Sequence, residues 1–351
     1  MLKSIKTITI VGHFAVGKDL LNGQTVKTKI LAKELKKQLG ENEVDTIDTH
    51  GGKKALPKLF FQSVSALRRS KNVVILPAHN GIRFFVPVLH FFNRFYKRKL
   101  FYVVIGGWLP TFLKDKKKLE KQLKNFDGIF VETQTMKNAL QDMGFANVSV
   151  MPNCKDLKIL TEEELVYPQE EPYKLCTFSR VMKEKGIEDA VQAVRTVNEK
   201  FERVVYTLDI YGQVDENQTE WFERLQKDFP VYIRYGGLVE FDKSVDVLKN
   251  YFALLFPTRF YTEGIPGTII DAYAAGLPVL ASRWESYLDI IQDGQTGFGY
   301  DLNDLQGLIA LLERFGKCPS ECGNLKRNCL QQAYMYQPQE TVNNFIERME
   351  I

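Results

Sequence analysis

Short apolar runs alternate with stretches of helical periodicity along most of the chain. Runs such as Ile5–Val11 and Phe101–Ile105 are typical of strands that are buried on both faces of a sheet. Between them, apolar residues recur at helical spacing, as in Leu56–Arg69. The strands expected in the first half are Ile5–Val11, Val44–Asp48, Asn72–Pro77, Phe101–Ile105, Gly128–Glu132 and Val148–Met151, separated by helices over Thr25–Leu39, Leu56–Arg69, Arg83–Arg98, Leu119–Asn125 and Met136–Met143.

The alternation weakens over the acidic, proline-bearing segment 153–172 and then restarts, which indicates a join between two domains. The second half is expected to contain strands at Lys174–Phe178, Val204–Tyr211, Val231–Tyr235, Tyr251–Phe256 and Val279–Ala281, and helices at Gly186–Lys200, Thr219–Asp228, Ser244–Asn250, Thr268–Gly276 and Tyr287–Gln292 before two or three final helices. Strands that alternate with helices predict parallel sheets. The fold class is therefore α/β, with two doubly wound, Rossmann-like domains facing across a cleft.

The composition, 44% hydrophobic and 26% charged residues over 351 positions, is that of a soluble globular protein. The net charge of +4 is unevenly divided. Residues 1–155 carry 27 Lys and Arg against 11 Asp and Glu, a net charge of +16, whereas the remainder carries 20 against 32, a net charge of −12. The basic half is therefore expected to meet an anionic partner. Nucleic acid is not expected, because no recognition motif accompanies the charge.

The five cysteines show no paired spacing. Cys318, Cys322 and Cys329 are clustered, but no histidine lies near them, so free thiols in a reducing cytoplasm are favoured over a zinc site. The N-terminus lacks the apolar core of a signal peptide. The longest uncharged stretch, Leu100–Leu113, has 14 residues and contains two glycines and a proline, too short and too broken to span a bilayer. We therefore expect a cytoplasmic protein.

Candidate chemistry is concentrated in Phe256–Ser282, which reads as strand, Gly/Pro-rich loop, helix and strand. The loop carries Glu263 and turns into the helix near Thr268. The N-terminus of a helix presents backbone N–H groups and a positive dipole end, which suit phosphate. With Asp271 in the helix, eight residues after Glu263, the stretch is expected to bind a ligand that is partly anionic and partly polyhydroxylated, such as a nucleotide sugar.

Two cations lie where a ligand of this kind would bind. Arg180 leaves the end of a strand and Lys185 precedes the next helix, so both can converge above the carboxyl ends of a parallel sheet. An arginine can donate two hydrogen bonds to one phosphate group, and a lysine supplies a charge on a flexible side chain. Taken alone, such a pair is more often a solvated surface.

The segment Gly12–Lys18 matches the phosphate-binding pattern G-x4-G-K after a strand. The next residue should be Ser or Thr to hold Mg²⁺, but it is Asp19, and the helix is expected to begin only after Asn22-Gly23. An ordinary loop is therefore favoured, with a P-loop as the alternative.

Taken in order, Arg180…Lys185, Glu263-Gly-Ile-Pro-Gly…Asp271-Ala and Ala275-Gly-Leu-Pro-Val resemble the C-terminal signature of retaining glycosyltransferases of family 4 (glycosyl transferases group 1). Asn22-Gly23 before a helix, and Val150-Met151-Pro152-Asn153, are similar to further elements of the family. The resemblance implies the GT-B fold, with an acceptor domain over 1–155, a donor domain over 172–336, and a last helix over about 337–351 that packs back on the first domain.

The resemblance also implies roles for individual residues. Arg180 and Lys185 would bind the donor diphosphate and stabilise its charge as the sugar leaves, and Glu263 would hydrogen-bond the donor sugar. Asp271, where the family has Glu, would contact the ribose. The backbone of Gly264, Ile265, Pro266, Gly267 and Thr268 would lie near sugar and phosphate, Gly212 and Gly237 near the base, and Gly23 and Gly107 in loops of the first domain.

Family members transfer a sugar from a nucleotide diphosphate to a hydroxyl with retention of anomeric configuration, and need neither metal nor cofactor. Where many have a histidine after the central strand of the first domain, this chain has Gly106-Gly107-Trp108, so backbone and Trp108, His79 or His13 would replace it.

The aromatic and basic stretch Arg83–Lys99, with Lys114–Lys118 downstream, would suit an anionic membrane surface and a lipid-linked or saccharide acceptor. A helix with an aromatic core face is an equal alternative. The alternatives to a transferase of cell-surface polysaccharide or glycolipid synthesis are a nucleotide-sugar epimerase of the same fold, a P-loop nucleotidase and a non-catalytic sugar-binding protein.

Overall fold

The computed structural model describes residues 5–17, 23–168 and 170–351. The chain forms two compact units. The N-terminal unit comprises Met1–Asp156 with Tyr336–Ile351, and the C-terminal unit comprises Leu157–Met335. Among the described residues, no helix is long and apolar enough to cross a membrane.

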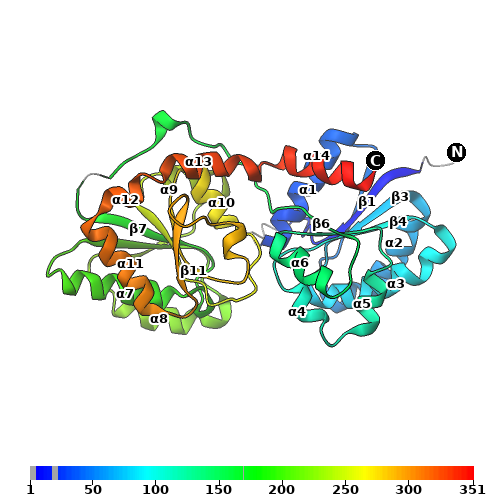
Figure 1. The fold of residues 1–351 in the computed structure, drawn as a ribbon. Helices are drawn as coiled ribbons and strands as arrows, with labels where there is room; N and C mark the ends of the chain where they lie inside the picture. Colours follow the sequence, from blue (N-terminus) through cyan, green and yellow to red (C-terminus); the bar gives the residue numbers. More distant parts are fainter. Residues whose placement is uncertain (1–4, 18–22, 169) are drawn as a thin grey trace. The chain divides into compact units, whose positions relative to one another are not determined.

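The N-terminal unit is built on a six-stranded sheet in the order β2-β1-β3-β4-β5-β6, with every pair parallel (Figure 1). Its core strands are buried on both faces, as their continuous Val, Ile and Phe runs predict. The strands are β1 (Lys6–Gly12), β2 (Val44–Asp48), β3 (Ser70–Ile75), β4 (Lys99–Val103), β5 (Gly128–Val131) and β6 (Val148–Val150), and the helices are α1 (Gly23–Leu39), α2 (Leu56–Arg69), α3 (His79–Tyr96), α4 (Leu109–Leu113), α5 (Lys117–Leu123) and α6 (Gln134–Asp142).

The C-terminal unit repeats this design with a parallel sheet in the order β12-β11-β10-β7-β8-β9 (Figure 1). Its strands are β7 (Tyr173–Phe178), β8 (Tyr206–Tyr211), β9 (Ile233–Gly237), β10 (Ala253–Phe256), β11 (Val279–Arg283) and β12 (Gly297–Asp301), and its helices are α7 (Ile187–Lys200), α8 (Thr219–Lys227), α9 (Ser244–Leu248), α10 (Gly267–Ala274), α11 (Leu305–Lys317), α12 (Pro319–Gly323) and α13 (Lys326–Ala333).

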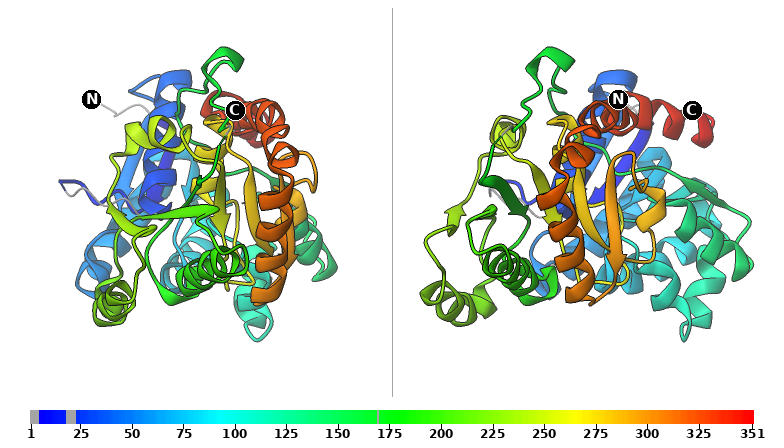
Figure 2. Two further views of the ribbon diagram at one scale, coloured as in Figure 1. Left: turned by 90° about the vertical axis from the view of Figure 1, so that its left-hand side faces the viewer. Right: turned by 60° about the vertical axis from the view of Figure 1, so that its left-hand side comes forward.

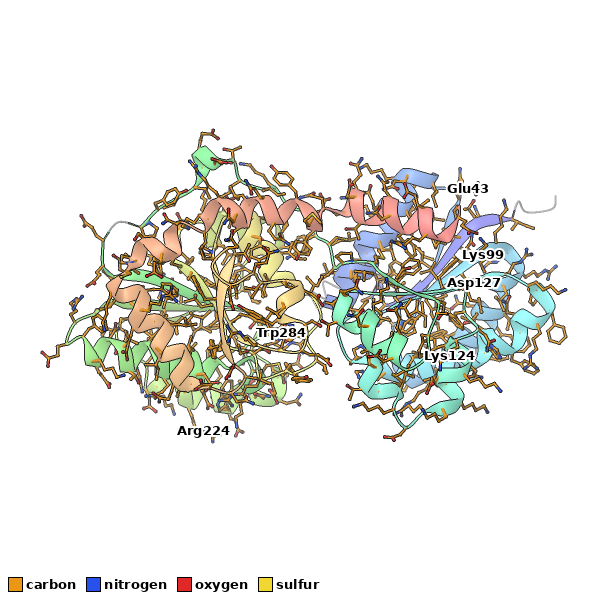
Figure 3. The ribbon with its side chains drawn as sticks, in the orientation of Figure 1. Glu43, Lys99, Lys124, Asp127, Arg224 and Trp284 are labelled. Atoms are coloured by element: carbon orange, nitrogen blue, oxygen red, sulfur yellow. The ribbon has the colours of Figure 1, made fainter. Side chains whose placement is uncertain are left out.

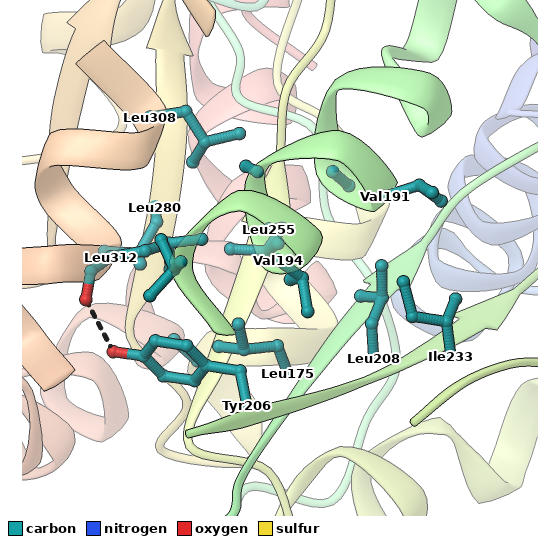
Figure 4. Close-up of a cluster of buried hydrophobic side chains, with 14 of the residues drawn as sticks. Leu175, Val191, Val194, Tyr206, Leu208, Ile233, Leu255, Leu280, Leu308 and Leu312 are labelled. Atoms are coloured by element: carbon teal, nitrogen blue, oxygen red, sulfur yellow. Dashed lines mark hydrogen bonds between the residues drawn. The ribbon is translucent and has the colours of Figure 1, made fainter. Parts of the chain in front are cut away.

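One face of the second sheet packs against α7 and α11 (Figure 4). Leu175, Leu208 and Leu255 from three strands are buried beneath Val194 of α7. At the margin of this core, the Tyr206 hydroxyl donates a hydrogen bond to the Leu312 carbonyl at 2.8 Å. This packing holds α7 against the sheet, and the segment that leads into α7 carries Lys185.

The last helix, α14 (Pro338–Met349), belongs to the N-terminal unit and lies along α1 (Figures 1 and 2). Phe345 stacks edge-on against Phe130 of β5, with ring centroids 4.5 Å apart. At its far end the Lys99 ammonium donates to the Glu350 carboxylate at 2.8 Å; Lys99 is labelled in Figure 3. The end of the chain is thus fixed to the first sheet by apolar packing and one ion pair.

A buried ion pair joins α1 to the carboxyl end of the same sheet. The Lys27 ammonium donates to the Glu132 carboxylate at 2.7 Å, and each side chain is only 2% exposed. Lys27 also reaches the Val104 carbonyl at 3.4 Å, just beyond β4. Buried charges of this kind are retained only when they are paired and hydrogen-bonded.

Three expectations about the elements need correction. The strand β12 was not predicted, because its sequence GFGYD has two glycines and no apolar run; it forms the edge of the sheet beside β11. The helix expected at Tyr287–Gln292 is a single 3₁₀ turn over Tyr287–Asp289. The helix α4 was also missed, because it has only five residues.

The segment interpreted as a join lies largely within the C-terminal unit. The Leu160 amide donates to the Ala274 carbonyl at 3.0 Å. Gly276, with φ of +61°, approaches Leu165 so closely that a Cβ atom there would lie 2.2 Å from its side chain. The beginning of this unit therefore packs on the end of α10.

Candidate active site

The order of strands in the second sheet brings the predicted site residues together. From β7 the chain passes to β8 on one side, whereas β10 lies on the other side of β7, so the strand order reverses between β7 and β10. Ligands of open α/β sheets bind at such a switch point, beyond the carboxyl ends of the strands. Arg180 and Lys185 follow β7, and Glu263 follows β10.

Lys185 and Glu263 form an ion pair at this point. The Thr258 hydroxyl donates a second hydrogen bond to the same Glu263 oxygen at 3.0 Å. The ammonium also lies 5.1 Å from the ring centroid of Phe260, and the two charged side chains are only 17% and 16% exposed. A carboxylate and a cation are thus held together in a partly desolvated position, where their interactions with a ligand are stronger than in water.

Gly186 allows the chain to place Lys185 there. It adopts φ of +68°, and a Cβ atom at this position would lie 1.8 Å from the Pro257 carbonyl oxygen. The loop after β7 therefore passes directly over the residue that follows β10, which brings the two halves of the site into contact.

We expect Gly186→Ala to lower the free energy of unfolding by about 1–3 kcal/mol, because the added methyl group overpacks against backbone. Urea unfolding would measure the loss. Gly294→Ala, at another left-handed glycine of the unit with a neighbouring atom only at 4.0 Å, is the control for backbone strain alone. Equal losses in the two variants would contradict the close-packing argument.

Arg180 lies on the other side of the loop. Its guanidinium is 49% exposed and lies 3.6 Å from the Asp215 carboxylate. Gly212, with φ of +134°, crosses the same loop so closely that a Cβ atom would lie 1.8 Å from the Ser179 carbonyl oxygen. The amide of Gly212 donates to the Gly237 carbonyl at 2.9 Å, so the two glycines expected near the base lie side by side.

A shallow cavity of about 430 Å³ lies beside β8, β9 and α9, lined by Lys174, Asp209, Tyr211, Arg234, Lys243, Asp246, Val247, Asn250 and Tyr251. The Arg234 guanidinium donates two hydrogen bonds to the Asp209 carboxylate, at 2.6 and 2.8 Å. The Tyr251 hydroxyl donates to the same carboxylate at 2.5 Å. Burial opposes ionisation of Asp209, but the hydrogen bonds from Arg234 and Tyr251 outweigh it and lower the pKa of the carboxyl.

The glycine loop leads into α10 as the sequence predicts. Gly264 and Ile265 are buried, Pro266 precedes the helix, and Gly267 begins it. The Thr268 hydroxyl in the first turn is buried and has no hydrogen-bond partner. A buried polar group without a partner carries a free-energy penalty that a ligand can relieve. Thr268 is therefore a candidate donor to a bound oxygen.

Asp271 is 3% exposed and accepts a hydrogen bond from the Ser244 hydroxyl at 3.0 Å. This contact joins α10 to the start of α9. The predicted contact between Asp271 and a ribose stays a prediction.

The G-x4-G-K segment after β1 already holds an anion. The amides of Phe14, Ala15 and Val16 donate to the Asp48 carboxylate at 3.0–3.1 Å, and the His50 amide donates at 3.0 Å. Backbone N–H groups of this kind would cradle phosphate in a P-loop. Here the end of β2 occupies them, and α1 begins only at Gly23. Lys18 and Asp19 lie outside the described residues, as does Asn22.

We expect Asp48→Ala to lower the free energy of unfolding at pH 7 by about 2–3 kcal/mol, because four backbone amides, three of them partly buried, lose their acceptor. Burial opposes ionisation of Asp48, but the four backbone donors outweigh it and lower its pKa. Its stabilisation is therefore complete above the unfolded-state pKa of about 3.9 and is lost as the pH falls through the folded-state pKa. In urea unfolding, the free energy of unfolding should therefore change less between pH 7 and pH 3 in Asp48→Ala than in the wild-type protein.

Asp45→Ala is the matched control, because Asp45 lies on the same strand, is about one third exposed, and contacts Arg69 at 3.5 Å and the adjacent Thr46 amide at 3.0 Å. Its loss should stay within about 0.5 kcal/mol. Equal losses of stability in Asp48→Ala and Asp45→Ala at pH 7 would show that the Asp48 carboxylate does not stabilise the loop after β1.

Three of the four histidines lie in two clusters beyond the carboxyl ends of the strands of the N-terminal unit. His13, after β1, contacts Thr25 at 2.7 Å and the His50 ring at 3.1 Å. His79, at the start of α3, stacks on Trp108, with ring centroids 3.9 Å apart, and burial and then Arg83 and Lys116 lower its pKa. Trp108 follows Gly107 and donates to the Ile105 carbonyl at 2.8 Å. Either cluster offers a neutral imidazole at the switch point between β1 and β3.

All five cysteines are free thiols. Within residues 5–17, 23–168 and 170–351, no three His, Cys, Asp or Glu side chains are grouped so that they could hold a metal ion. Metal independence stays a prediction.

Several residues of the site were not predicted. Ser244 and Asp48 act through contacts with residues 27 and 34 positions away. Thr258 contacts Glu263 five positions on, but no local pattern distinguishes any of the three from other Thr, Ser and Asp residues. The loop before α10 was found because it carries its own local pattern of Gly, Pro and Glu.

Comparison with known proteins agrees with this geometry. Residues 162–334 match the family model described as glycosyl transferases group 1. The chain is 23% identical over 279 residues to an uncharacterized 41.2 kDa protein in the cps region of Klebsiella pneumoniae, covering 74% of each chain. It is 25% identical over 155 residues to the putative colanic acid biosynthesis glycosyltransferase WcaL of Salmonella typhimurium, covering 42% of this chain and 36% of that protein.

The fold is similar over its whole length to that of Anabaena Alr3699/HepE, solved with UDP and glucose, at a TM-score of 0.73 and 12% identity, covering 98% of this chain and 99% of that one. The two parallel sheets thus form the GT-B fold, as predicted. Residues 162–334 are therefore similar to the glycosyl transferases group 1 family, and the chain as a whole has the GT-B fold.

Proposed function

We propose that this protein transfers a sugar from a nucleotide diphosphate sugar to a hydroxyl acceptor, with retention of anomeric configuration. The observation that carries the proposal is the Lys185–Glu263 pair at the switch point of the second sheet. The unpartnered Thr268 hydroxyl, at the start of the helix that follows Glu263, supports it.

Each charged group has one task in this scheme. Glu263 accepts hydrogen bonds from hydroxyl groups of the donor sugar, while Lys185 neutralises the diphosphate. Arg180, half-exposed and only 3.6 Å from Asp215, exchanges that carboxylate for phosphate oxygens. The N-terminus of α10 stabilises negative charge on the same group. Asp271, within this helix, contacts the ribose, and the base lies beside Gly212 and Gly237.

The reaction replaces one bond at the anomeric carbon. The bond from this carbon to the diphosphate oxygen breaks, and a bond to the acceptor oxygen forms on the same face. The acceptor proton passes to the departing diphosphate oxygen, so the diphosphate acts as the base. The developing negative charge is stabilised by Lys185 and Arg180, which are already in place before the reaction.

The acceptor is a saccharide or a lipid-linked saccharide of cell-surface polysaccharide or glycolipid synthesis, used in the cytoplasm or at the inner face of the membrane. The colanic acid glycosyltransferase among the relatives supports a polysaccharide product, and the UDP and glucose bound to Alr3699/HepE support a nucleotide-sugar donor.

The experiment is incubation of the protein with each of a set of nucleotide sugars, with and without oligosaccharide and glycolipid acceptors. We expect a glycosylated product only with acceptor, and proton NMR of that product should show the anomeric configuration of the donor. Conversion of the donor sugar without acceptor would support the epimerase instead. Inversion in the product would overturn the retaining mechanism.

A further inference from the structure

The helices α2 and α3 pack side by side in the N-terminal unit (Figure 1). A continuous row of aromatic rings lies on the surface of this helix pair. Phe61 of α2 is 72% exposed, and Phe91 and Phe95 of α3 are 52% and 73% exposed. The half-buried rings of Phe60 and Phe92 connect these exposed rings. Phe60 lies edge-on to Phe61, and Phe92 lies edge-on to Phe91. Phe60 and Phe92 also pack edge-on against each other, with ring centroids 5.5 Å apart. Exposed apolar patches of this kind mark interaction sites.

The charge around these rings has one sign. Residues 49–114, which include all of α2 and α3, contain 12 Lys and Arg and no Asp or Glu. Lys58 and Arg68 lie at i−3 and i+7 from Phe61 on the exposed stripe of α2. On α3 the Arg94 guanidinium lies 5.8 Å from the centroid of the Phe91 ring, and Lys97 is exposed beyond Phe95.

The basic run Lys114–Lys118 differs from these cations, because some of its side chains contact other residues of the unit. The Lys117 and Lys124 ammonium groups donate to Glu120 at 3.2 and 2.7 Å, and Lys116 lies over the Phe112 ring (Lys124 is labelled in Figure 3). Part of this charge is therefore neutralised within the unit. The cations beside the aromatic row, in contrast, lie in the stretch 49–114, which contains no Asp or Glu.

We propose that the outer face of α2 and α3, defined by Phe61, Phe91, Phe95 and the cations Lys58, Arg68, Arg94 and Lys97, docks on the surface of an anionic lipid bilayer. Aromatic rings insert at the boundary between headgroups and acyl chains, while basic side chains remain at the level of the anionic headgroups. This surface deepens the proposed function, because it would hold the acceptor-side unit beside lipid-linked acceptors.

A bilayer fits these observations better than a second copy of the chain. The face is rich in positive charge, so two identical copies would repel each other across it. A lipid surface supplies an extended field of negative charge and requires no matching shape.

The test is sedimentation of the full-length protein with vesicles, in the absence of any donor or acceptor. The vesicles contain either phosphatidylcholine alone or phosphatidylcholine with 30% phosphatidylglycerol, a composition chosen for its negative surface. We expect binding to the anionic vesicles, little binding to the neutral ones, and release by added salt. Because no sugar transfer is measured, this result is independent of the proposed reaction.

Two variants separate the contributions. Phe61→Ser/Phe91→Ser/Phe95→Ser should lower the partition coefficient at least about tenfold, because the inserted apolar area is lost. Arg94→Gln should lower it about fivefold. The control Val231→Ser/Tyr334→Ser/Met335→Ser removes three exposed apolar side chains of the C-terminal unit and should leave binding unchanged. Circular dichroism would establish that each variant is folded.

Three results would overturn the proposal. The first is an absence of binding of the wild-type protein to anionic vesicles at low salt, and the second is equal binding by the aromatic and control variants. The third is a dimer in sedimentation velocity that the aromatic variant alone abolishes, which would assign the face to a second copy of the chain.

Discussion

Lys185→Ala is expected to lower kcat for sugar transfer about 10²–10³-fold, the typical loss when one preorganised group that stabilises transition-state charge is removed. The cation that stabilises the departing diphosphate is lost, and the carboxylate of Glu263 loses its partner in a position only 16% exposed. Steady-state kinetics with the preferred donor would measure kcat and KM separately. The main effect should fall on kcat, because the charge develops as the bond breaks.

Lys200→Ala is the matched control for this variant. Lys200 also forms an ion pair with a glutamate, Glu313, in the same unit, but it is about half exposed and lies at the C-terminal end of α7, whereas Lys185 precedes the N-terminal end. Its loss should leave kcat unchanged within about twofold. If Lys185→Ala retained the activity of Lys200→Ala, the ion pair would be structural, and the assignment of the site would be wrong.

Lys27→Ala is expected to destabilise the N-terminal unit by about 3–5 kcal/mol, because it removes one partner of a buried ion pair and leaves the other charge behind. Both side chains of the pair are 2% exposed, so water cannot replace the lost cation without rearrangement. Urea unfolding can be followed by the fluorescence of Trp108 in a Trp221→Phe/Trp284→Phe background, because the other two tryptophans belong to the C-terminal unit.

Lys33→Ala provides the comparison on the same helix, because Lys33 pairs with Asp156 in an exposed position and should contribute at most about 1 kcal/mol. The double variant Lys27→Met/Glu132→Leu should recover most of the stability, since two apolar side chains require no charge partner. A loss of less than about 1 kcal/mol in Lys27→Ala would show that Glu132 is stabilised without this cation.

The elements with strong local patterns were predictable from the sequence. Buried strands such as β10 carry uninterrupted apolar residues, and α2 begins and ends where its periodicity does. The parallel topology followed from the alternation of these elements, and the candidate donor loop carries its Gly, Pro and Glu within a few residues of each other. Glu263 and Lys185 could be brought together in the prediction because both follow strands of one sheet.

Contacts between distant residues were not predictable. Asp48 lies on β2, and nothing in VDTID indicates that it binds the amides after β1. The pairing of Lys27 with Glu132 joins residues 105 positions apart. The edge strand β12 packs by backbone pairing rather than by apolar side chains, so it left no hydrophobic signal. Local patterns thus locate the elements and the glycine loop, whereas tertiary contacts decide which charges meet.

The most direct test of the donor site is isothermal titration calorimetry of a set of nucleotide sugars against the wild-type protein, Lys185→Ala and Lys200→Ala. We predict that the wild-type protein binds one of these donors, that Lys200→Ala binds it equally well, and that Lys185→Ala binds it at least about tenfold more weakly, as expected for the loss of a charge-assisted contact worth about 1.5–3 kcal/mol. Equal affinity in all three proteins, or no binding of any nucleotide sugar to the wild-type protein, would contradict the account.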